Sequence, residues 1–226
     1  MRRAWVVAAS GLFVLSLMAG VWVKGQSGGV GYHAAGVAQA GSIPYPINSQ
    51  APGFVTLDVS VDPSGAVQNV MVVRDVPPLT AAAQGAVKNW QFTSATADGQ
   101  AAPGVVPVDV AFNPYNPSGV GLPGESLQPP NTTASGDFQP AGLVKAKYAA
   151  YPPNTVASGT VVMMLRVGTD GNVHRVRVLH GNGVLADAAA AAAKTWGFTP
   201  ATYKGTAVGA DVAVAFVFAP PQAGTR

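Results

Sequence analysis

The chain is organised by an internal repeat, because residues whose numbers differ by 106 carry the same kind of side chain over a long stretch. The match runs without a gap from residues 45–112 to residues 151–218. Identical pairs along it include Tyr45/Tyr151, Pro46/Pro152, Gly65/Gly171, Trp90/Trp196, Phe92/Phe198 and Gly99/Gly205. Paired tryptophans and glycines at one constant offset indicate that the chain holds two copies of one small domain.

The second copy predicts two strands, a helix and a third strand. Residues 160–167 form a β-branched and apolar run, and the Asp170-Gly171-Asn172 sequence that follows is typical of a hairpin turn. The return strand, residues 173–179, places Val176 and Val178 on one face and Arg175 and Arg177 on the other. A helix follows, because Leu185, Ala188, Ala189, Ala192 and Trp196 recur at helical spacing. Residues 211–218 then alternate between large and small apolar side chains, which predicts the third strand.

The first copy has the same pattern, with strands at 55–61, 67–73 and 106–112 and a helix that begins after Pro77 and Pro78. We therefore predict an α+β protein with two small ββαβ domains, which follow an N-terminal hydrophobic helix. Each domain would be a three-stranded antiparallel sheet with one helix on one face. About 70 residues bury only a modest core, so pairing between copies or between chains would add stability.

The N-terminal residues 1–24 predict a membrane anchor or a signal peptide. Arg2 and Arg3 precede an uncharged run over residues 4–23, which Lys24 closes. As a helix this run is about 30 Å long, enough to cross the hydrocarbon core, and the positive flank stays inside. Either outcome exports the remainder of the chain. A cleaved signal would leave a periplasmic protein instead of an inner-membrane anchored one.

The basic character of the chain belongs to this targeting segment. The sequence has 13 Lys and Arg against 10 Asp and Glu, and three of the 13 flank the apolar run. Beyond Lys24 the basic and acidic residues balance, so the charge gives no case for nucleic acid as a partner.

Composition shifts divide the chain further. Residues 25–42 form a Gly/Ala-rich stretch and residues 113–142 a Pro/Gly-rich stretch, both typical of linkers. The expected domains are therefore residues 43–112 and residues 143–218, with a short tail over residues 219–226.

The sequence offers no catalytic, cofactor-binding or metal-binding constellation. It has no Cys, which excludes a thiolate metal site and a cysteine nucleophile. Its three histidines, His33, His174 and His180, are scattered, and no paired carboxylates stand out. We expect a protein that is not an enzyme and needs no cofactor.

The second copy closely resembles the C-terminal domain of TonB-family energy transducers. The resemblance rests on Tyr151-Pro152-Pro153, on Gly159-Thr160-Val161, on the segment from Trp196 to Ala201 (WGFTPA) and on Val214-x-Phe216-x-Phe218. It covers residues 143–218 well. Residues 43–112 form a degenerate copy, in which Ser94 stands where the family pattern has Pro.

The resemblance implies a protein of the Gram-negative cell envelope that binds extended segments of outer-membrane transporters, or of other envelope proteins, by strand addition. By resemblance, the partner-binding edge strands would carry Val212, Val214, Phe216 and Phe218 in copy two and Val106, Val108, Val110 and Phe112 in copy one. The structural motif would comprise Tyr151, Pro152, Trp196, Phe198, Pro200, Trp90 and Phe92. The same edge strands could also pair with another copy of themselves, including in a homodimer.

Two departures from the family keep a second interpretation open. The energised members carry a Ser-x-x-x-His face on the membrane helix, whereas residues 13–23 contain no His. The long Lys- and Pro-rich spacer is also missing, because only about 20 residues separate Lys24 from Pro44. The alternative is a periplasmic scaffold or adaptor without a link to the proton motive force.

Overall fold

The computed structural model describes residues 31–47, 49–181 and 183–221, which form an α+β fold with two helices and mostly sheet. The helices are α1 (Leu79–Val87) and α2 (Gly183–Ala193). Six long strands are β3 (Gly53–Val61), β4 (Val67–Arg74), β8 (Gly104–Asn113), β12 (Gly159–Val167), β13 (Val173–His180) and β17 (Ala210–Phe218). The predicted α+β class is confirmed, and the long strands lie where the sequence places them.

Short strands add to the simple ββαβ pattern in both copies. Copy one has β1 (Tyr32–His33), β2 (Gly36–Gln39), β5 (Gln91–Thr93), β6 (Ala95–Ala97) and β7 (Gln100–Ala102). Copy two has their counterparts β10 (Phe138–Gln139), β11 (Gly142–Ala146), β14 (Gly197–Thr199), β15 (Ala201–Tyr203) and β16 (Thr206–Val208), and β9 (Glu125–Ser126) lies between the copies. The structural repeat therefore begins at Tyr32 and Phe138.

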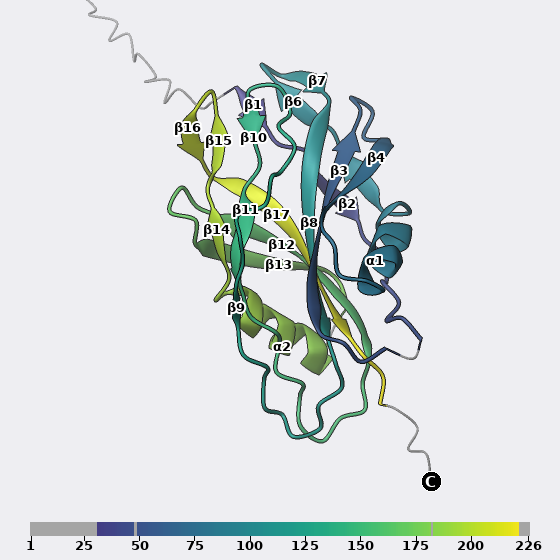
Figure 1. The fold of residues 1–226 in the computed structure, drawn as a ribbon. Helices are drawn as coiled ribbons and strands as arrows, with labels where there is room; N and C mark the ends of the chain where they lie inside the picture. Colours follow the sequence, from purple (N-terminus) through teal and green to yellow (C-terminus); the bar gives the residue numbers. More distant parts are fainter. Residues whose placement is uncertain (1–30, 48, 182, 222–226) are drawn as a thin grey trace, which may run out of the picture.

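The six long strands form one continuous sheet in the order β13-β12-β17-β8-β3-β4 (Figure 1). Within each copy the neighbours are antiparallel, but β17 and β8 pair in parallel and so join the copies. The two three-stranded antiparallel sheets expected from the sequence are therefore halves of one sheet, because the last strands of the two copies, β8 and β17, pair with each other. The outer strands β4 and β13 consequently point in the same direction.

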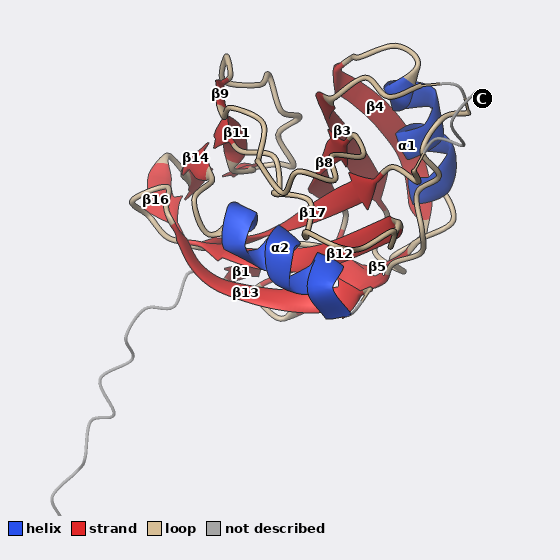
Figure 2. Ribbon diagram, turned by 90° about the horizontal axis from the view of Figure 1, so that it is seen from below, coloured by secondary structure: helices blue, strands red, loops and turns tan. Residues whose placement is uncertain are grey.

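The two helices lie on opposite faces of this sheet (Figure 2). In the parallel pair Val108 stands opposite Ala213, one residue away from its equivalent position. Because side chains alternate along a strand, this odd offset turns equivalent residues to opposite faces. Helix α1 accordingly packs on β3 and β4 on one side, and α2 packs on β12 and β13 on the other.

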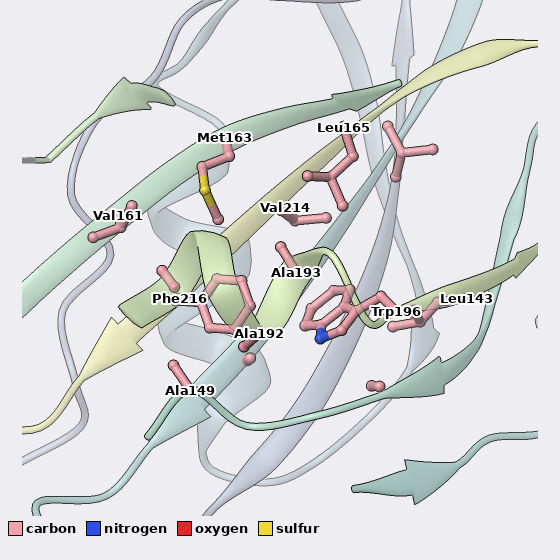
Figure 3. Close-up of a cluster of buried hydrophobic side chains, with 14 of the residues drawn as sticks. Leu143, Ala149, Val161, Met163, Leu165, Ala192, Ala193, Trp196, Val214 and Phe216 are labelled. Carbon is pink, nitrogen blue, oxygen red and sulfur yellow. The ribbon is translucent and has the colours of Figure 1, made fainter. Parts of the chain in front are cut away.

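Each face carries its own hydrophobic core. Under α2 the ring of Trp196 packs 5.1 Å from that of Phe216, beside Met163 and Leu165 (Figure 3). The opposite core gathers Leu79 of α1 with side chains of both copies. Each helix covers only its own copy, so the rest of each face needs another cover.

That cover comes from the segments that lead into each copy, residues 40–46 and 146–152. The backbone N–H of Ile43 donates to Oγ1 of Thr160 at 2.8 Å, and Thr160 returns a bond to the carbonyl of Ile43 at 2.9 Å. In the equivalent place the N–H of Ala149 donates to Oδ1 of Asn113 at 2.9 Å. Each segment thus crosses onto the sheet of the other copy.

The linker predictions need correction for the same reason. Residues 32–39, expected in a Gly/Ala-rich linker, form β1 and β2, and β2 pairs with β5. Residues 113–142 also pack on the fold: the N–H of Thr133 donates to Oδ2 of Asp58 at 2.5 Å, and Arg74 donates to the carbonyl of Gln128 at 3.0 Å. Backbone that is bonded to the sheet in this way does not act as a free tether.

The predicted N-terminal hydrophobic helix, anchor or signal, lies outside the described residues. Among the residues that the structure does describe, neither helix has the length and apolar character needed to span a membrane.

Candidate functional site

The strands predicted as partner-binding edges lie in the middle of the sheet. Strand β17 pairs with β12 on one side and β8 on the other, and β8 pairs with β17 and β3. The side chains concerned are all almost fully buried: Val106, Val108, Val110, Phe112, Val212, Val214, Phe216 and Phe218. Their assignment as edges is wrong, and the alternative, pairing with another copy of the same strand, is what the structure shows within one chain.

The free edges are β4 in copy one and β13 in copy two. Each pairs along one side only, with β3 and β12 respectively, so each presents a row of N–H and C=O groups without a partner strand in the described sheet. Three large apolar side chains on these edges are unusually exposed, namely Met71, Val72 and Val178. Such edges are open to pairing with a further extended segment.

The hairpin turn at the base of each edge is fixed by a carboxylate. Oδ1 of Asp62 accepts bonds from the N–H of Ser64 at 2.8 Å and of Ala66 at 3.0 Å. In copy two Asp170 accepts from the side chain and the N–H of Asn172 and contacts His174, and these bonds lower the pKa of Asp170 to about 2. Hydrogen bonds likewise lower the pKa of Asp62, so the carboxylate in each turn is ionised at neutral pH.

The predicted structural motif is part of the cores. Tyr151, Trp196, Phe198, Trp90 and Phe92 are buried, and Pro152 and Pro200 are half-buried. The Nε1–H of Trp196 donates to the carbonyl of Lys147 at 2.9 Å, and the hydroxyl of Tyr151 donates to the carbonyl of Ala219 at 3.1 Å. These residues hold the lead-in segment and the end of β17 in place, and so they support the fold.

A buried acidic cluster in copy one escaped the sequence analysis. The hydroxyl of Thr56 donates to Oδ1 of Asp109 at 2.7 Å and accepts from Arg74 at 3.0 Å, and Asp58 lies close by. Burial raises the pKa of Asp109 to about 7, against the hydrogen bond from Thr56, and burial also raises the pKa of Asp58. Oδ1 of Asp58 and Oδ2 of Asp109 find no hydrogen-bond partner among the described residues. Copy two has Val162, Met164 and Ala215 at the positions equivalent to Thr56, Asp58 and Asp109.

The signal for this cluster was present in the sequence. Asp58 and Asp109 each interrupt an otherwise apolar strand, and a buried carboxylate in such a place needs a local partner. We find the cluster beneath residues 128–133, which it binds through Thr133 and Gln128.

The two copies also meet through aromatic stacking. Tyr32 stacks on its equivalent residue Phe138, with ring centroids 4.8 Å apart, and on Tyr203 at 5.1 Å. A hollow of about 470 Å³ opens beside them, lined also by His33 and Arg166. Within the described part of the chain, no group of His, Asp and Glu is arranged to hold a metal ion.

Comparison with known proteins gives one family match. The model described as Gram-negative bacterial TonB protein C-terminal matches the chain twice, over residues 45–114 and 147–220. The two segments together make up more than half of the chain and correspond to the two copies of the repeat. No curated protein and no solved structure matches the chain.

Proposed function

Because the chain belongs to the family of Gram-negative TonB C-terminal domains, whose members are protein-interaction domains of the cell envelope, we propose that it binds an extended segment of a partner by strand addition. The partner class is an outer-membrane transporter or another envelope protein. The observation that carries the proposal is a described sheet that ends on both sides in a strand whose outer row of backbone groups has no partner strand. Main-chain pairing at such an edge supplies affinity, and alternate side chains supply selectivity.

The binding edges in this proposal are β4 and β13. The last strand of each copy is not available, because β8 and β17 use their free sides on each other. Exposed apolar side chains at Met71, Val72 and Val178 favour the outer strands further, since a seventh or eighth strand would cover them.

We also propose that residues 4–23 anchor the chain in the inner membrane and place the fold in the periplasm. Arg2 and Arg3 would then stay in the cytoplasm. The described fold begins at Gly31, only a few residues beyond Lys24. The binding edges would therefore sit close to the membrane that anchors them.

A second candidate is a scaffold or adaptor that uses the same edges without energy from the proton motive force. The packing of residues 113–142 favours it, because Thr133 and Gln128 bind the sheet through Asp58 and Arg74. Residues 113–142, when they pack in this way, do not provide a spacer with which to reach across the periplasm.

Photo-crosslinking from the two edges in living cells tests the proposal. A benzoylphenylalanine at Val178 on β13, or at Val72 on β4, would label the partner, and the same group at the exposed Asp187 on α2 is the control. We expect adducts with an outer-membrane transporter from the edge positions and not from Asp187. Equal labelling from all three positions would contradict strand addition. Adducts with other envelope proteins, whose yield is insensitive to an uncoupler, would select the scaffold.

A further inference from the structure

The edge of copy two carries a row of arginines. Arg175 stands opposite Arg166 of β12, and Arg166 stands opposite Asp211 of β17, so the three side chains cross three strands in one line. Arg177 stands one step along, opposite Met164. Because Arg175 and Arg177 are two residues apart, they share one face of the outermost strand.

These arginines are only partly neutralised. Arg166 contacts Asp211 at 3.4 Å, and both side chains are about half exposed (46% and 49%), so the pair contributes little energy. Neither Arg175 nor Arg177 forms an ion pair with a described residue. The other contact that a carboxylate makes in this hairpin, Asp170 with His174, lies at its turn. The face therefore retains positive charge at the free edge.

The arginines border a hollow of about 400 Å³ on the surface, which Met164 and Val176 line together with them and Asp211. Arginines around a hollow that the apolar side chain of Met164 also lines suit a segment that alternates apolar and acidic side chains. In an extended segment, charged residues at every second position lie on one face. Their spacing along the chain equals the spacing between Arg175 and Arg177 on β13.

The edge of copy one lacks this chemistry. The positions equivalent to Arg166, Arg175 and Arg177 hold Ser60, Asn69 and Met71. The repeat therefore carries two edges of the same backbone geometry and different charge. Copy one serves as a built-in reference for the contribution of the arginines.

We propose that the free edge of β13 is selective for an acidic extended segment, which pairs with β13 as a further strand and places two alternate carboxylates on Arg175 and Arg177. The inference rests on the proposed strand addition and specifies its partner. Charge-assisted hydrogen bonds from the two arginines to carboxylates would set the register of the added strand. They would also select an acidic segment over a neutral or basic one.

A synthetic nine-residue peptide tests the selectivity against the full chain. The probe alternates Glu with Val and Thr, and a matched isomer has Gln in place of Glu. We expect the Glu peptide to bind at least tenfold more tightly than the Gln peptide at low salt, and the difference to shrink in high salt. Equal affinity for the two peptides would overturn the inference.

Paired variants locate the effect. The double substitution Arg175→Glu with Arg177→Glu should abolish the preference for the Glu peptide, and Arg175→Gln with Arg177→Gln should remove it without reversing the charge. The matched control, Asn69→Glu with Met71→Glu on β4, should leave the preference intact. All four side chains are exposed, and circular dichroism confirms that each variant remains folded. A preference that survives the change at β13 would contradict the assignment.

A backbone-modified peptide separates this inference from the proposed function. N-methylation of alternate residues in the Glu peptide removes the N–H groups that would pair with β13. We expect binding to be lost. If the methylated peptide binds as well as its parent and still depends on Arg175 and Arg177, then strand addition fails. If methylation abolishes binding but the Gln peptide binds equally well, strand addition stands and the acidic selectivity is wrong.

Discussion

Ile43 and Ala149 occupy equivalent positions in the two repeats, and each donates its backbone N–H to a polar side chain of the other repeat. Ile43 binds Thr160, and Ala149 binds Asn113. This exchange, with the parallel pairing of β8 and β17, makes the two copies a pseudo-dimer within one chain.

Replacing Thr160 by Val should destabilise the fold by about 2 kcal/mol. Valine keeps the shape but leaves the N–H and the C=O of Ile43 without their shared partner. Chemical denaturation measures the loss, and hydrogen exchange should show faster exchange at Ile43. Thr206→Val, at an exposed position, is the control and should change the stability little. A Thr160→Val protein as stable as this control would show that the exchanged contact is dispensable.

Replacing Leu79 by Ala should destabilise both copies together. Leu79 is fully buried in α1, and its truncation leaves a cavity that costs about 2–5 kcal/mol. Because one sheet runs through both copies, hydrogen-exchange protection should fall in β12 as much as in β3. Unchanged protection in β12 would mean that the copies unfold independently. Val184→Ala, at an exposed position, should affect neither.

The stability of the protein should fall as the pH rises from about 4 to above 7. The folded pKa of Asp109, about 7, exceeds its ordinary value, so the folded state holds a proton that the unfolded state releases near pH 4. The bound proton adds about 4 kcal/mol to the free energy of unfolding below pH 4, and this contribution is lost as the pH rises through 7.

Asp109→Asn tests that dependence, since the amide keeps the shape and does not ionise. Denaturation midpoints between pH 5 and 8 should slope less steeply in this variant than in the parent. Some slope should remain, because burial also raises the pKa of Asp58. The exposed Asp187→Asn variant should keep the full slope. If Asp109→Asn and Asp187→Asn have equal slopes, the acidic cluster does not govern the pH dependence.

Replacing Gly171 by Ala should cost about 3 kcal/mol or more, and replacing Gly205 by Ala should cost about 1 kcal/mol. Both glycines have a φ of +75°, which L-residues disfavour. The two positions differ in their surroundings. A Cβ at Gly171 would collide with the carbonyl oxygen of Phe198, whereas a Cβ at Gly205 would have no other atom within 4 Å. Thermal melts compare the two variants. Equal costs would show that the turn at Gly171 can move away from β14.

The long strands were predictable because strong turn signals bound them. Gly65 and Gly171 adopt positive φ in hairpins that the Asp-containing turns also mark, and the helix starts follow Pro78 and Gly181. Such local signals identify elements without knowledge of their neighbours. The hairpin pairing of the first two long strands in each copy followed from the same reasoning.

The position of β17 and β8 was not predictable from one copy alone, although the sequence contained a hint. Ala213, Ala215 and Val217 make the second face of β17 apolar too, which is typical of a strand covered on both faces. A strand at a solvated edge would not need that. The strand that pairs with the second side of β17 belongs to the other copy. Its identity therefore depends on tertiary contacts, which the pattern of one copy does not reveal.

The short strands β1 and β2 were missed for a different reason. Tyr32 to Gln39 has no alternating pattern and is rich in Gly and Ala, which is typical of a linker. The pairs Ala35/Ala141 and Gly36/Gly142 extend the repeat into this stretch, but two small residues are weak evidence by themselves. Here tertiary pairing with β5 decides the structure.

The common direction of β4 and β13 has a mechanical consequence. Two segments added antiparallel to these strands would run the same way, and so their ends would leave the molecule on the same side. Tension on either segment would act along the strands and strain every bond of the added row at once, in shear. A pull at right angles would open those bonds one after another. Two segments added to β4 and β13 would therefore bear load in the same direction and in the same mode.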